Sequence, residues 1–220
     1  MEPRLWACLV ALAPFFPSGA VMDAGANDGS SSLLLAKAFP ARALIAIEPI
    51  RANVAAIRRR LGGFPNATVV RGGLGAARSA ASYPREMDAR RAGASNQVGQ
   101  ISNYAWQRRR SDRVTFPVLT VDSVFENRRL GFAHWDVEGG ELDLLRGAVR
   151  TIMRDRPWFT LETFPKTNPA LHRNLTTFVT DELRYRLQTI REVCGRPRDC
   201  RNMLAVPSES FDPARHRCPG

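Results

Sequence analysis

The amino-acid sequence predicts one α/β domain built on a seven-stranded, mostly parallel sheet with helices on both faces. Short apolar runs alternate with helix-like segments between residues 20 and 162, a pattern typical of parallel strands joined by crossover helices. Two more strand-like runs follow, close enough to pair as a hairpin. The 220 residues, 44% of them hydrophobic, suffice for one domain with a full core and exclude global disorder or a low-complexity fibre.

The predicted strands are apolar runs that mostly end at glycine, proline or an acidic residue: 20–24, 43–48, 68–71, 132–136 and 157–162. Helices are predicted at 30–39, 53–61, 141–154 and 169–184. In the third helix, Leu142, Leu145, Val149 and Ile152 recur at the spacing of one buried face. Segments 185–193 and 202–206 form the terminal strand pair, and the tail from Pro207 is predicted as loop.

Residues 74–113 interrupt the alternation. They are rich in Ala, Ser, Arg and Gly, which predicts an insertion or lid. Order returns at 114–121, and Asp122 and Ser123 are suited to cap the short helix that follows. We therefore expect a domain at 20–207, with an N-terminal apolar segment at 1–19 and a C-terminal tail at 208–220.

The N-terminal segment carries an apolar run at residues 5–12, preceded by Arg4. Such a run is typical of a secretory signal, but cleavage after Ala20 would shorten the first strand, and cleavage after Ala13 would leave Pro14 beside the cut. A short apolar helix packed on the domain is the preferred interpretation. No apolar run reaches the roughly 18 residues of a membrane span, so none is predicted.

Four cysteines leave the compartment open between cytoplasmic and secretory-lumenal. Cys194 and Cys200 flank a turn-like segment, where either a disulfide across a hairpin or two free thiols would fit. No pairing is evident for Cys8 or Cys218. No Cys-x-x-Cys or Cys/His spacing predicts a metal site.

A glycine loop between the first strand and the first helix of the alternating units is the most specific local signal. It reads Asp-Ala-Gly-Ala-Asn-Asp-Gly over residues 23–29. A loop of small residues lets a nucleoside-bearing ligand approach the backbone, and the helix after it presents unpaired N–H groups. A tight turn that needs positive φ at Gly25 and Gly29 is the structural alternative.

An acidic residue, Glu48, follows Gly29 by 19 residues at the end of the second strand. At that position a carboxylate can accept hydrogen bonds from both hydroxyls of a ribose. The loop is not Gly-x-Gly-x-x-Gly, and Asp23 suits a cationic group better than a pyrophosphate, which disfavours a nicotinamide dinucleotide. S-adenosylmethionine has an ammonium, a sulfonium and a ribose but no phosphate, so it is the predicted cofactor.

Two sequence blocks carry a family resemblance. The first is V-M-D-A-G-A-N-D-G at 21–29 with I-E-P at 47–49, and the second is D-V-E-G-G-E-L-D-L-L-R-G-A at 136–148 with R-P-W-F-T-L-E at 156–162. Together with L-T-V-D-S at 119–123, they resemble the FkbM family of S-adenosylmethionine-dependent methyltransferases. The resemblance implies a Rossmann-like methyltransferase fold with an antiparallel last strand, and O-methylation of a hydroxyl on a sugar-containing or other small metabolite.

The resemblance also implies roles for individual residues. Those around the methionine part of the cofactor are Asp23, Gly25, Asn27 and Gly29. Glu48 is the ribose acid, and Asp136 and Glu138 end the fourth strand facing the transferred methyl. Two departures stand out: His134 occupies a position where the family often has Lys, and the family often has more sequence before the first strand than residues 1–19. The short segment before the first strand leaves two interpretations open: the chain is a fragment, or it lacks a segment that covers the substrate.

Asp136, Glu138 and Glu162 are the candidate catalytic residues, at the carboxyl ends of adjacent strands where ligands of open α/β sheets bind. Methyl transfer from a sulfonium needs an acceptor oxygen held in line, and a carboxylate can take its proton. Asp136 is the preferred base or anchor. For Glu138 and Glu162, a structural role and a catalytic role carry equal weight. Glu141 is expected to stabilise a helix start and His134 to be a core residue. No spacing demands a metal.

The net charge of +11 comes from a chain whose basic residues, 32 in all, are Arg except for Lys37 and Lys166. Such a charge is typical of proteins that bind nucleic acid or anionic membranes. The cluster Arg108–Arg110 with Arg113 could bind a phosphate or sulfate on an acceptor, and a solvated face is the alternative. Only Tyr104 and Trp106 accompany this cluster, too few for a stacking platform. The prediction is a small-molecule or glycan acceptor, with nucleic acid disfavoured. A non-catalytic cofactor-binding module of the same fold and an RNA methyltransferase stay open as alternatives.

Overall fold

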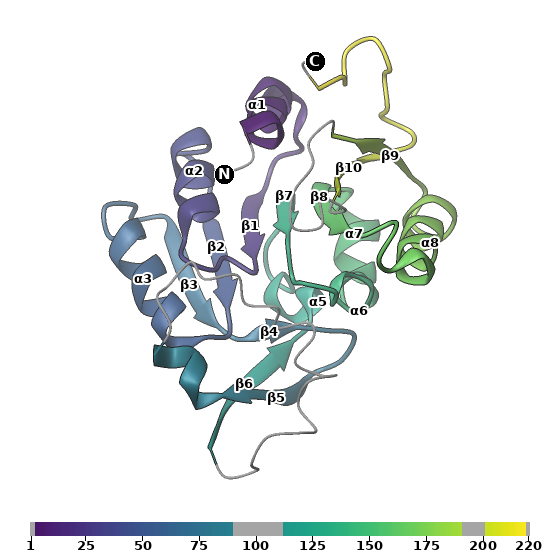
Figure 1. The fold of residues 1–220 in the computed structure, drawn as a ribbon. Helices are drawn as coiled ribbons and strands as arrows, with labels where there is room; N and C mark the ends of the chain where they lie inside the picture. The colour runs from purple at the N-terminus through teal and green to yellow at the C-terminus, as the bar shows by residue number, and fades with distance from the viewer. Residues whose placement is uncertain (1–2, 90–111, 191–200, 219–220) are drawn as a thin grey trace.

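The main sheet confirms the predicted α/β class. The structure, a computed structural model, describes residues 3–89, 112–190 and 201–218 (Figure 1). Within them, seven strands form one sheet in the order β3-β2-β1-β7-β8-β10-β9. Its strands are β1 Ala20–Ala24, β2 Leu44–Glu48, β3 Ala67–Arg71, β7 Leu130–Trp135, β8 Trp158–Thr163, β9 Tyr185–Thr189 and β10 Arg201–Pro207. β10, the last strand, is antiparallel to both of its neighbours, and the pairs among β3, β2, β1, β7 and β8 are parallel.

Strand order reverses between β1 and β7. From β1 the chain moves outward through β2 to β3, and it then returns to place β7 on the other side of β1. In open α/β sheets the crevice outside the carboxyl ends of the strands, at such a reversal, is where ligands bind. The topology therefore predicts a ligand site at the ends of β1, β2 and β7.

Helices cover both faces of the sheet, because successive side chains of each buried strand point to opposite faces. Val21 packs in one apolar cluster with α1 Pro3–Leu12, α2 Ser30–Ala38 and α3 Arg51–Leu61. Its neighbour Met22 packs in the other cluster, which includes residues of α5 Val121–Val124, α6 Glu141–Arg146, α7 Val149–Asp155 and α8 Pro169–Thr177. A π-helical turn, Phe178–Glu182, follows α8, so the predicted helix at 169–184 is two elements.

The predicted single helix at 141–154 is wrong, since it divides into α6 and α7 at Gly147. A Cβ on Gly147 would overlap the carbonyl oxygen of Gly75, so the two backbones meet closely there. The predicted capping by Asp122 is wrong as well. Thr120 is the N-cap of α5 and forms a capping box with Ser123. The Asp122 carboxylate instead accepts hydrogen bonds from backbone N–H groups in the first turn of α7.

A second, small sheet arises in the region expected as an insertion or lid. It has the order β4-β6-β5, from β4 Gly73–Leu74, β5 Ser79–Pro84 and β6 Arg113–Leu119, and a 3-10 helix at Arg85–Ala89 follows β5. Tyr83, Val114 and Phe116 form its apolar core with Ile50 of the main domain. Figure 1 shows the small sheet beyond the carboxyl ends of β1 and β2. The cluster Arg108–Arg110 lies outside the described residues.

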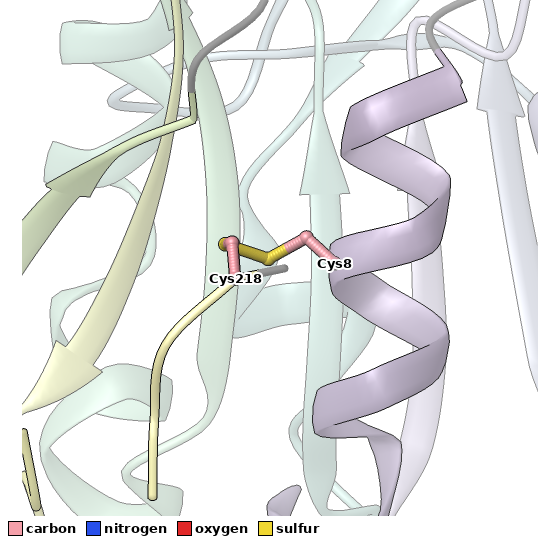
Figure 2. Close-up of a disulfide and its surroundings, with 2 residues drawn as sticks. All are labelled: Cys8 and Cys218. Carbon is pink, nitrogen blue, oxygen red and sulfur yellow. A yellow bond between two sulfur atoms is a disulfide. The ribbon is translucent and has the colours of Figure 1, made fainter. Parts of the chain in front are cut away.

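The N-terminal segment forms the apolar helix α1, as the preferred interpretation expected. Leu5, Cys8, Leu9 and Leu12 are buried on its inner side. Cys8 forms a disulfide with Cys218 of the C-terminal tail, 210 residues later, a pairing that was not predicted (Figure 2). Cys194 and Cys200 lie outside the described residues. None of the helices that the structure describes is long and apolar enough to cross a membrane.

Candidate functional site

A cavity of about 680 Å³ opens at the strand reversal. The main sheet contributes the ends of β1, β2 and β7 to its wall, through Gly25, Glu48 and Asp136 among others. The small sheet contributes the opposite wall, which is made largely of glycine, alanine and serine between residues 72 and 82, with Arg113, Phe116 and Val118 of β6. This volume lies within the range of cofactor and ligand sites.

The glycine loop after β1 forms one edge of the cavity. Gly25 has φ +78°, and a Cβ there would overlap the carbonyl oxygen of Asp136, so the loop and the end of β7 approach through bare backbone. Gly29 also has positive φ, at the start of α2, but it packs against Ile57 of α3 and does not line the cavity. Asn27 adopts a left-handed φ of 47° and does line the cavity.

Glu48, at the end of β2, joins the glycine loop to the start of α3. Its Oε2 accepts a hydrogen bond from the backbone N–H of Asn27 over 3.0 Å. Its Oε1 accepts from the backbone N–H of Ile50 over 3.0 Å and from the amide nitrogen of Asn53 over 3.1 Å. Burial raises the pKa of Glu48 to about 6, against the opposing effect of these donors. The carboxylate is thus held in one orientation at the cavity wall.

Sequence reasoning missed Asn53, which completes this network. Its amide nitrogen donates to Glu48 and, over 3.2 Å, to the side-chain oxygen of Asn27. Asn53 is 2% exposed and lies on the same face of α3 as the buried Ile57 and Leu61. A polar residue on an apolar helical face, five positions after the acid of β2, is the signal that could have found it.

Asp23 does not line the cavity. Its buried carboxylate accepts hydrogen bonds from the hydroxyls of Ser31, over 2.8 Å, and Ser32, which ties the end of β1 to the first turn of α2. Its Oδ1 is buried without a hydrogen-bond partner among the described residues. Asp28, in the same loop, pairs with Arg60 of α3 over 2.8 Å. Both acids position the glycine loop.

The loop after β7 places two predicted catalytic residues on the cavity wall. Asp136 and Glu138 line it, and the backbone N–H of Asp136 donates to Ala24 over 3.0 Å. Glu138 adopts a left-handed φ of 55°, a conformation that costs a non-glycine residue about 1 kcal/mol and that is enriched at functional sites. Burial, with a smaller contribution from the charge of Glu141, raises the pKa of Glu138 to about 7.

Glu141 and His134 have the structural contacts that the sequence interpretation expected. Glu141 accepts hydrogen bonds from the backbone N–H groups of Val137, over 3.3 Å, and Gly139, over 3.1 Å, which closes the loop after β7. Burial raises the pKa of Glu141. The ring of His134 is buried, 2.8 Å from the hydroxyl of Thr160 and edge-on to Trp6.

Glu162 is separate from the other two candidate catalytic residues. It lies near the carboxyl end of β8, paired in register with Asn202 of β10, and it is not part of the cavity lining. Its catalytic role stays a prediction without support from the cavity geometry. Among the described residues, no group of three or more His, Cys, Asp or Glu side chains is arranged to hold a metal ion.

Charges in the cavity lining are mostly negative. Of the described residues that line it, four are acidic, namely Glu48, Asp136, Glu138 and Asp143, and one is basic, Arg113. Asp143 forms an ion pair with Arg146 over 3.0 Å. From the sequence, Arg113 was grouped with the cluster Arg108–Arg110 as a candidate contact for an anionic acceptor, but it was not included among the site residues. The arrangement suits a ligand with a cationic group near the ends of β2 and β7.

Comparisons with solved structures support the fold. The chain is similar to a methyltransferase FkbM from Methylobacillus flagellatus KT, with TM-score 0.58 and 18% identity over 86% of this chain. It spans only 44% of that protein's chain. An O-methyltransferase from Bacillus cereus in complex with SAH gives TM-score 0.53 and 13% identity over 92% of this chain and 79% of the other.

A third similar structure is an rRNA methylase from Streptococcus thermophilus, with TM-score 0.51 and 9% identity over 93% of both chains. No curated protein matches the chain at a significant level. The profile of the methyltransferase FkbM domain, however, matches residues 23–187, which is most of the chain and includes both sequence blocks except Val21 and Met22. The chain therefore belongs to the FkbM methyltransferase family.

Proposed function

We propose that this protein is an S-adenosylmethionine-dependent O-methyltransferase that acts on a hydroxyl of a small-molecule or glycan acceptor. The observation that carries the proposal is the fixed carboxylate of Glu48 on the wall of a cavity at the strand reversal. In this class of fold an acid at the end of the second strand accepts hydrogen bonds from ribose hydroxyls.

The residues present fit such a cofactor. Glu48 Oε2 accepts one hydrogen bond from the described residues and so retains capacity for a ribose hydroxyl. Gly25 and Asn27 form a loop edge without bulky side chains, along which the methionine part would lie. The acidic lining at the ends of β2 and β7 favours the positive charges of an ammonium and a sulfonium.

The acceptor hydroxyl would lie near the loop after β7. When bound, the cofactor supplies a methyl group on a positively charged sulfur, which leaves as a neutral thioether. We assign Glu138 as the general base: its carboxylate takes the hydroxyl proton as the new oxygen–carbon bond forms. A pKa of about 7 suits this role, because the group is then partly ionised at neutral pH and still basic. Asp136 lies on the same wall and orients the acceptor.

A small acceptor is favoured over nucleic acid by the charge of the cavity. Four carboxylates and one guanidinium line its described part, a balance that repels a phosphate backbone. The described lining is net negative, so the positive net charge of +11 lies in the rest of the chain. RNA binding can be tested by filter binding over a salt series, since binding driven by phosphate contacts must fall steeply as salt is added.

The test of the proposed function is methyl transfer by the intact protein. The chain would be incubated with S-adenosylmethionine and a library of polyols, glycans and hydroxy acids, and release of S-adenosylhomocysteine would be measured by mass spectrometry. We expect turnover with at least one acceptor, loss of turnover in Glu138→Gln, and normal turnover in the control Glu126→Gln, whose side chain is exposed. Cofactor binding without transfer to any acceptor would instead support a non-catalytic module.

A further inference from the structure

Arg113 is the one basic side chain among the described residues that line the cavity. It begins β6, where it pairs in register with Pro84 at the end of β5. The small sheet meets the main sheet at both ends of this strand: Val118 pairs with Gly73 just after β3, and Val114 packs in one apolar cluster with Ile50 just after β2. Five residues of extended chain separate Arg113 from Val118, roughly 17 Å. Arg113 therefore belongs to the small-sheet wall of the cavity, whereas the residues proposed to hold the cofactor belong to the main sheet and its loops.

The guanidinium of Arg113 is held by a single partner. Its Nε donates to the hydroxyl of Ser82 over 2.7 Å, and its Nη2 donates to the backbone carbonyl of the same residue. It forms no ion pair with any residue that the structure describes, in contrast to Arg85, which pairs with Asp112 at the same end of the small sheet. Ser82 thus holds the guanidinium of Arg113 in place, and no acidic side chain among the described residues neutralises its charge.

The N–H donors of Arg113 that Ser82 leaves free determine which ligands Arg113 can bind. A guanidinium has five N–H donors, and Ser82 takes two of them along the edge formed by Nε and Nη2. The other edge, formed by Nη1 and Nη2, keeps its donors in the planar fork that matches a carboxylate or a phosphate. Ser82 fixes the plane of that fork, so less side-chain freedom is lost when an anion binds.

We propose that Arg113 binds an anionic group of the acceptor, a carboxylate or a phosphate, and so selects acidic hydroxyl compounds over neutral ones. This inference rests on the proposed function, because it concerns the acceptor of that reaction. Near Glu48 and Asp136 the cavity is acidic and the cofactor's cationic groups are expected, whereas Arg113 on the opposite wall favours a single negative charge. A single anionic group beside Arg113 is compatible with this lining. A polyanion that runs through the cavity would also meet the four carboxylates.

The test uses the intact protein saturated with S-adenosylhomocysteine and titrated with glucose, glucuronate and glucose 6-phosphate in a calorimeter. We expect either anionic probe to bind about 10- to 100-fold more tightly than glucose, as for hydrogen bonds to a charged group. The two anionic arms distinguish a carboxylate from a phosphate. Arg113→Gln should abolish the preference, Arg113→Lys should retain part of it, and the control Arg85→Gln should leave it unchanged.

The titration of S-adenosylhomocysteine alone separates the possible failures. A folded chain that does not bind it contradicts the proposed function, and this inference then fails with it. If the product binds, equal affinity for the three probes, absence of saturable binding by both anions, or an unchanged preference in Arg113→Gln overturns the role of Arg113 alone. Weaker binding of S-adenosylhomocysteine by Arg113→Gln, with melting temperature preserved, also overturns it, since Arg113 would then hold the cofactor's own carboxylate.

Discussion

The backbone N–H of Asn27 donates a hydrogen bond to Oε2 of Glu48 across 3.0 Å. This contact joins the glycine loop after β1 to the end of β2, two segments that the sequence separates by 21 residues. The same carboxylate that is proposed to bind the cofactor therefore also fixes the shape of the loop beside it. Loss of Glu48 must affect both, and the two effects can be measured separately.

Glu48→Ala is expected to weaken S-adenosylhomocysteine binding about 10- to 100-fold, because charge-assisted hydrogen bonds to the ribose are lost. It should also lower the free energy of unfolding by about 1 to 3 kcal/mol, since donors from Asn27, Ile50 and Asn53 lose their acceptor. Calorimetry and urea unfolding measure the two effects. The control Glu126→Ala should change neither, and normal affinity in folded Glu48→Ala would exclude the ribose role.

The rate of methyl transfer is expected to depend on the ionisation of Glu138, whose pKa burial raises to about 7. Only the ionised carboxylate can take a proton, so kcat/KM should fall as pH decreases through about 7 and level off above it. Glu138→Gln should reduce kcat by about 100- to 10,000-fold with little change in cofactor affinity. A pH profile that is the same in wild type and Glu138→Gln would contradict the assignment.

Gly25→Ala is expected to destabilise the domain by roughly 2 kcal/mol or more, because the added Cβ overlaps the carbonyl oxygen of Asp136 and the backbone φ is +78°. Gly63→Ala is the matched control, since an added Cβ there meets nothing within 4 Å. Urea unfolding of the two variants provides the comparison. Equal stability would mean that the loop after β1 and the end of β7 do not meet through bare backbone.

The disulfide between Cys8 and Cys218 closes a loop of 210 residues. Its removal in Cys8→Ala should lower the free energy of unfolding by about 2 to 5 kcal/mol. S-adenosylhomocysteine affinity should be preserved, because neither cysteine lines the cavity, and Figure 1 shows α1 at the end of the molecule opposite the small sheet. The double variant with Cys218→Ala should be as stable as Cys8→Ala; a further large loss would show that the two residues act independently.

The main sheet could be predicted because its strands carry their own signals. The apolar run Ile45–Ile47, for example, ends at an acid and a proline and is followed by a helical pattern. β5 could not be predicted, because Ser79, Ala80 and Ala81 are small residues with little strand preference. That strand exists because it pairs with β6 and packs Tyr83 against Ile50, contacts that only the folded chain creates.

The candidate site could be predicted where one residue determines the chemistry, and not where several elements must meet. Glu48 was identified from its position after the glycine loop, and the cavity contains it. Asp23 was expected near the ligand, but the hydroxyls of Ser31 and Ser32 hold it behind the loop. Arg113 was considered for an anionic acceptor only as part of the stretch Arg108–Arg113, and its place on the cavity wall depends on pairing in the small sheet, which the sequence did not predict.

The central claim is that the cavity at the strand reversal holds S-adenosylmethionine, and its most direct test is calorimetric titration of the intact, folded protein with S-adenosylhomocysteine. We predict saturable binding of one molecule per chain, with affinity that falls as pH decreases through about 6, where Glu48 becomes protonated. Absence of binding by a chain whose circular dichroism and cooperative unfolding show that it is folded would contradict the account.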